Sequence, residues 1–145
     1  MSNVYVVVAE SSRARVYQTN LHLQDLQEIT DFSHPESRQH ARDITADLPG
    51  RLAATGAGSH HAVQAKTDIK KHQADEFARQ IAIYLQQALE QGKYDHLVLI
   101  APPAFLGLLR QHLSKNVAAS VRYELDKELL HASADELRAH LPKHL

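Results

Sequence analysis

The chain of 145 residues contains no cysteine. Disulfide bonds, thiolate nucleophiles and cysteine-bound zinc are therefore excluded. No apolar run approaches the roughly 18–20 residues that a membrane-spanning helix needs. The first residues show neither the basic segment nor the apolar stretch of a secretory signal. We therefore expect a cytoplasmic protein that has no membrane partner.

An excess of charge of one sign is also absent, because the formal net charge is −1. This balance argues against a generic nucleic-acid coat, so any contact with a polyanion has to be local. The length suits one domain over residues 1–145, and no internal repeat or linker divides the chain. Hydrophobic residues make up 43% and charged residues 23%, which is typical of globular proteins.

Hydrophobic patterning predicts a series of β-strands. Residues 4–8 are a β-branched and aromatic run, and residues 14–19 alternate behind a short polar turn, which together predict an antiparallel hairpin. Residues 26–32 form a weaker strand. Residues 96–101 are continuously apolar, as in a strand covered on both faces. A last strand is centred on residues 121–123.

Helical periodicity separates these strands. Apolar residues step mostly by four from Ile69 onward and predict a helix over 67–91, with Thr67 or Asp68 as its cap and Gly92 as its end. A second helix is expected over 104–113.

A last helix starts at Ser133, where Glu136 completes a capping box. The order of the elements predicts an α/β (α+β) fold with one mixed sheet. An antiparallel meander comes first, a right-handed β-α-β crossover follows, and helices flank the sheet.

Charge and turn-forming residues gather between His34 and His72. Residues 43–66 contain prolines and glycines but no period of either kind, and predict a long loop, which in a compact domain is usually functional or disordered. We select the cations and two histidines of this segment as candidate nucleic-acid or anion-binding residues. They are Arg38, Arg42, Arg51, His60, His61, Lys66, Lys70 and Lys71.

Arginine and lysine clamp phosphates, and Gly56 and Gly58 would let backbone N–H groups approach a ligand. Lys70 and Lys71 are expected in the first turn of the 67–91 helix, where they oppose the helix macrodipole. A bound phosphate would resolve that conflict. The alternative is a solvated loop whose charges only maintain solubility.

Metal binding and catalysis have weaker signals. His60, His61 and His72 follow no His-Glu-x-x-His spacing, and exposed or helix-packed imidazoles explain them equally well, so no metal or cofactor is expected. Ser11 and Ser12 lie in no Gly-x-Ser-x-Gly elbow, and no catalytic residue is assigned.

The pair Pro102-Pro103 follows a buried strand, a place where ligands often bind in open α/β sheets. We favour a plain strand-to-helix turn there, because proline lacks the N–H donor that an anion needs.

Several motifs in order resemble the bacterial family of host attachment proteins, also described as proteins required for attachment to host cells. They are VAESSRARVY at 8–17, HPESR at 34–38, DLPGR at 47–51, LVLIAPPAFLGLLR at 97–110 and ELDKEL at 124–129. The resemblance covers nearly the whole chain. That family is similar in fold to the central domain of archaeal and eukaryotic peptide-chain release factors, which implies a translation-related α/β fold.

In the release factors a Gly-Gly-Gln loop reaches the peptidyl-transferase centre. The comparable loop here reads TGAGS at 55–59, with Gln64 further on, so the resemblance does not extend to peptide release. Our leading hypothesis is a non-enzymatic RNA-binding or ribosome-binding module that uses the basic loop. The alternatives are a protein-interaction factor linked to attachment and a hydrolase acting at the histidine-rich loop.

Overall fold

The computed structural model describes the backbone of residues 2–33 and 56–145, and the side chains of residues 2–33 and 65–145. Five strands form one mixed sheet in the order β3-β2-β1-β4-β5. The strands are β1 (Val4–Ala9), β2 (Arg13–Thr19), β3 (Gln27–Ser33), β4 (His96–Ile100) and β5 (Val121–Leu125). β1, β2 and β3 pair antiparallel, whereas β4 runs parallel to both β1 and β5. The predicted meander and mixed sheet are confirmed.

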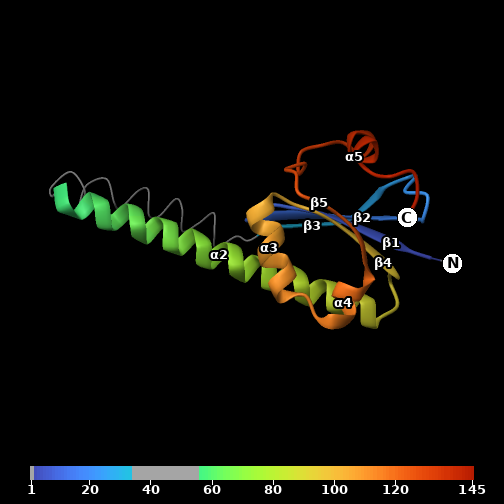
Figure 1. Ribbon diagram of the computed structural model, residues 1–145, viewed down its shortest axis with the longest axis horizontal. Helices are drawn as coiled ribbons and strands as arrows, with labels where there is room; N and C mark the ends of the chain where they lie inside the picture. The colour runs from blue at the N-terminus through green and yellow to red at the C-terminus, as the bar shows by residue number, and fades with distance from the viewer. Residues whose placement is uncertain (1, 34–55) are drawn as a thin grey trace.

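Helices cover both faces of this sheet, as Figure 1 shows. The helices are α2 (Gly56–Glu90), α3 (Pro103–His112), α4 (Lys115–Ser120) and α5 (Ala134–His140). α2, α3 and α4 lie on one face, and α5 lies on the other. All six residues of β1 are buried, because its side chains alternate between the two covered faces.

Aromatic rings fasten α2 to the sheet. Phe77 of α2 lies with its ring centroid 5.9 Å from that of Phe32 on β3 and 6.0 Å from that of Phe105 on α3. Tyr84, two turns further along α2, lies 5.5 Å from Phe32. We call these four rings the aromatic row. Such pairs stabilise beyond the apolar area that they bury, so the row fixes the position of α2.

The start of α2 corrects one prediction. The helix begins at Gly56 rather than near Thr67, so the part of the predicted 43–66 loop from residue 56 onward is helical. Alanine, glutamine, histidine and lysine dominate this stretch and contain no proline, so summed helix propensity outweighs the two glycines. Ile69 is 37% exposed, because the amino-terminal turns of α2 extend beyond the sheet (Figure 1).

A second correction concerns the segment before β5. Residues 115–120 form the short helix α4, capped by the Ser114 side chain, which accepts a hydrogen bond from the Val117 amide at 3.2 Å. The sequence pattern predicted no helix there and indicated only a last strand centred on residues 121–123. The strand itself and the Ser133–Glu136 capping box are confirmed.

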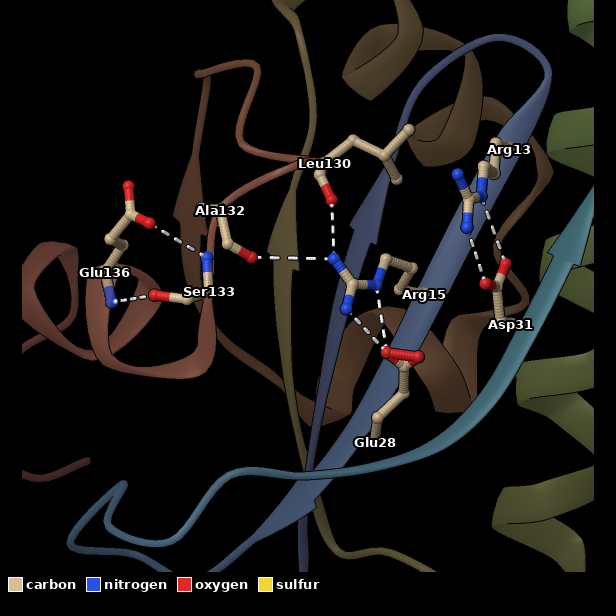
Figure 2. A network of polar contacts seen from close by, with 8 residues as sticks. All are labelled: Arg13, Arg15, Glu28, Asp31, Leu130, Ala132, Ser133 and Glu136. Carbon is tan, nitrogen blue, oxygen red and sulfur yellow. Dashed lines mark hydrogen bonds and ion pairs between the residues drawn. The ribbon is translucent and has the colours of Figure 1, made fainter.

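On the α5 face, one arginine joins three parts of the chain (Figure 2). The Arg15 Nη1 atom on β2 donates to the carbonyl oxygens of Leu130 at 2.9 Å and Ala132 at 3.5 Å. Its Nε and Nη2 atoms donate to the Glu28 carboxylate on β3 at 3.0 and 2.7 Å. We call this group the Arg15 node. It ties the edge strand to the segment that leads into α5.

Replacing Arg15 with methionine should lower the free energy of unfolding by about 1–3 kcal/mol, because a charge-assisted network is lost and its acceptors are left without their donor. The midpoint of urea denaturation measures the loss. Arg13→Met is the matched control. Among the described residues the Arg13 side chain bonds to one partner, the Asp31 carboxylate, through Nη2 at 2.7 Å and Nε at 3.3 Å, so its loss should cost less. Equal losses would contradict the structural role assigned to the node.

Tyr94 should make stability depend on alkaline pH. Burial raises the pKa of this phenol to about 12, and its hydroxyl donates to the Leu85 carbonyl at 2.7 Å. The unfolded phenol ionises near pH 10. The stabilisation is therefore complete below about pH 10 and is lost as pH rises from there toward 12. Urea denaturation across this range should show the decline, and Tyr94→Phe should make it shallower. An unchanged decline would sink the assignment to Tyr94.

Candidate functional site

A cleft of about 620 Å³ lies where the chain leaves β1 and β4, beside α2 and α3. Its volume falls in the range of small-molecule sites, about 300–1,000 Å³. β1 and β4 are parallel neighbours, and their connections diverge. The chain after β1 turns back into β2, and the chain after β4 enters α3. Such divergence opens a crevice at the carboxyl ends of the strands, the usual ligand site of open α/β sheets.

The floor of the cleft is apolar. It consists of Ala74 from α2, Pro102 after β4, and Ala104, Phe105 and Leu108 from α3. Phe105 is 4% exposed and ends the aromatic row. Phe105 belongs to the hydrophobic core, and Ala74 and Leu108 pack against it. This part of the floor is therefore held by the same packing that positions α2.

The rim of the cleft is polar. It consists of Glu10 and Ser11 at the end of β1, and Lys70 and Lys71 on α2. The turn after β1 is fixed by the Glu10 amide, which donates to the Arg13 carbonyl at 2.8 Å. Both lysines are exposed and Glu10 is half-buried. The cleft therefore joins an apolar surface to cations, a carboxylate and a hydroxyl.

The lysines of α2 differ from the paired arginines of the fold. Within residues 2–33 and 65–145, Lys66, Lys70 and Lys71 form no ion pair. The arginines with carboxylate partners are Arg13, Arg15, Arg79 and Arg110. Since those partners neutralise the arginines internally, the α2 lysines keep their charge available for a ligand.

The structure places only some of the predicted site residues. Lys66, Lys70 and Lys71 lie on α2, and Lys70 and Lys71 reach the cleft. They do not lie in a first turn, because Lys70 is about four turns inside the helix. The proposed conflict with the macrodipole was therefore wrong. The remaining predicted residues lie outside the described side chains: Arg38, Arg42, Arg51, His60 and His61.

Metal and catalytic chemistry gain no centre from the described residues, which hold no group of three histidine, aspartate or glutamate side chains able to bind a metal. Glu76, one helical turn after His72, accepts hydrogen bonds of 3.0 and 2.6 Å from Arg79. Ser11 lines the cleft, but no histidine is among the lining residues described. The hydrolase hypothesis depends on His60 and His61 and stays a prediction.

Sequence reasoning missed two features. Glu10 and the α3 residues of the cleft belong to no local sequence motif of a binding site. The prolines at 102 and 103 argued against an anion site because they lack N–H donors, but side chains build the cleft. His112 Nε2 lies 2.8 Å from the Asp75 carboxylate and links α3 to α2. These residues are 37 positions apart, so no spacing motif could have shown the contact.

Comparison with known proteins identifies the family. The family model described as a protein required for attachment to host cells matches residues 5–141. The chain belongs to this family. An uncharacterized protein of Rickettsia prowazekii (strain Madrid E) is 32% identical over 71 residues, which cover 48% of this chain and 47% of that protein. The match thus spans about half the length of this relative.

The predicted resemblance to host attachment proteins is therefore confirmed, and the resemblance to release-factor domains stays a prediction. Among the helical residues described, none belongs to a stretch long and apolar enough to span a bilayer.

The floor and the rim should respond differently to substitution. Phe105→Ala should lower the free energy of unfolding by about 3–5 kcal/mol, since it removes a buried ring from the core. Lys70→Gln combined with Lys71→Gln should change stability little, because exposed side chains without partners are replaced. Urea denaturation of both variants makes the comparison. A strongly destabilised lysine variant would show that these charges serve the fold instead of a ligand.

Proposed function

We propose that this host attachment family protein is a cytoplasmic RNA-binding module that contacts RNA phosphates through the lysines of α2. The observation that carries the proposal is a set of lysines that pair with no described carboxylate, on a helix that extends beyond the sheet. Lys66 and Lys70 are one turn apart and share a helix face, and Lys71 is the next residue round the helix. We call these three residues the lysine face.

The charge distribution supports local contact with a polyanion. The formal net charge of the chain is −1, so attraction cannot come from the protein as a whole. It has to come from a surface where cations outnumber carboxylates. The lysine face meets this requirement, although the exposed Asp68, within one turn of each lysine along α2, reduces its positive potential. RNA that contacts such a surface is held through phosphates and without sequence preference.

The predicted likeness to release-factor central domains favours ribosomal RNA as the form of the partner. A projecting helix suits such a partner, because it can approach a crowded surface without displacing the sheet. We therefore expect the contact to occur on ribosomes or on structured RNA.

A protein partner is the second candidate, and the family description, a protein required for attachment to host cells, favours it. α2 also exposes large apolar side chains, with Ile69 37% exposed and Ile83 42% exposed. Single exposed apolar side chains also occur on free surfaces, so the family description carries more weight than these two isoleucines. Such a partner would connect the protein to attachment through regulation or assembly.

RNA binding should be sensitive to salt and to the lysine face. Fluorescence anisotropy with a labelled 20-nucleotide mixed-sequence RNA, from 50 to 200 mM salt, measures the slope of log affinity against log salt. Changing Lys66, Lys70 and Lys71 to glutamine should reduce the magnitude of that slope by about 2. With three phosphate contacts fewer, binding releases fewer counterions from the RNA.

The matched control changes Lys93, Lys115 and Lys127 to glutamine, which removes the same charge from exposed positions elsewhere. It should leave the slope almost unchanged. Binding that ignores salt, or equal losses in both triple variants, would exclude the lysine face as the contact. Co-purification from nuclease-treated cells separates the candidates, since a partner that survives the nuclease favours a protein contact.

A further inference from the structure

We propose that the cleft between β1, α2 and α3 is a binding site for a small organic anion that has an apolar body. This inference goes beyond RNA contact, because it concerns a concave site for one molecule and not a charged outer surface. It rests on three properties of the cleft: two adjacent lysines, an apolar floor, and a carboxylate and a hydroxyl from the end of β1.

The cations fix where the acid group lies. Lys70 and Lys71 are consecutive on α2, and both line the cleft. Consecutive helical residues point about 100° apart, so their ammonium groups can approach one acid group from two directions. Neither forms an ion pair with the described carboxylates of the chain. A carboxylate, sulfonate or phosphate entering the cleft therefore gains two cations without breaking an internal bridge.

The floor selects the body of the ligand. Ala74, Phe105 and Leu108 contribute apolar atoms to the lining of the same cleft. A volume of about 620 Å³ admits a molecule with two or three rings. Because Phe105 is fixed by the aromatic row, this surface is formed before the ligand arrives, which lowers the entropic cost of binding.

Glu10 and Ser11 line the cleft from the end of β1 and add a carboxylate and a hydroxyl that the ligand has to match. A carboxylate accepts hydrogen bonds and repels a second negative charge. The ligand should therefore carry an N–H or O–H donor for Glu10 and a single acid group for the two lysines. Polyphosphates are disfavoured, since their additional charges would face Glu10.

A matched pair of dyes tests the site. The dye 8-anilinonaphthalene-1-sulfonate has an aromatic body, an N–H group and one sulfonate, and N-phenyl-1-naphthylamine has the same body without the acid. We expect the sulfonate to bind at least tenfold more tightly by fluorescence titration. Amide shifts in two-dimensional NMR should cluster at residues 10–11, 70–74 and 104–108, since the prolines at 102 and 103 have no amide proton.

Two variants locate the binding. Lys70→Gln with Lys71→Gln should weaken the sulfonate about tenfold and leave the neutral dye unchanged, whereas Lys93→Gln should alter neither. Ala104→Phe should abolish binding of both dyes, because Ala104 is exposed at the start of α3 and a ring there fills the cleft. The spread of amide chemical shifts in the NMR spectrum of each variant shows whether it is folded.

Equal affinity for the two dyes, amide shifts that centre on another surface, or full binding by the Ala104→Phe variant would overturn the proposal. The result is separable from RNA binding. Ala104→Phe keeps Lys66, Lys70 and Lys71, so the RNA affinity should persist in a variant that no longer binds dye.

Discussion

The packing of Phe77 against Phe32 and Phe105 is the constraint on which the outer features of this protein depend. It joins a helix, an edge strand and a second helix that are far apart in sequence. Among the side chains of α2 that the structure describes, residues 65–90, the fully buried apolar ones begin at Phe77 and include Ile81 and Leu85. The aromatic row therefore determines the direction of the whole helix, the position of the lysine face and the floor of the cleft.

The other face of the sheet is closed by different chemistry. Valine and leucine side chains pack under α5, but a guanidinium group provides the connection between β2, β3 and the segment before α5. Arg15 also lies over the Tyr17 ring, 5.5 Å from its centroid. The Tyr17 hydroxyl is buried without a hydrogen-bond partner in the described part of the chain. This face thus tolerates one unsatisfied group beside a well-bonded arginine, at a cost that its apolar packing offsets.

Local patterns predicted the parts of the fold that local physics determines. The β-branched run of β1, the two-sided burial of β4 and the capping box at Ser133 each follow from neighbouring residues, and each is confirmed. The predicted start of α2 was wrong because Gly56 and Gly58 indicate a loop locally. The summed helix propensity of the residues that follow them outweighs that local signal. α4 was not predicted, because six residues are too few to show a helical period.

The cleft could not be predicted, because its residues come from positions as distant as Glu10, Lys70 and Leu108. Their proximity depends on the parallel pairing of β1 with β4 and on the direction of α2, and neither is encoded by spacing. The sequence did select Lys70 and Lys71, although for a macrodipole argument that the length of α2 removes. Charge density identified the lysines, and only the three-dimensional structure could show their neighbours.

The length of α2 has a mechanical consequence. The turns before Gln73 span about 25 Å at 1.5 Å per residue, and they form an arm whose fulcrum is the ring packing at Phe77. Lys70 and Lys71 lie next to that fulcrum, so bending of the arm moves its tip far more than it moves them. A displacement of the tip is therefore compatible with a nearly unchanged cleft, and the ring packing at Phe77 takes up the resulting torque.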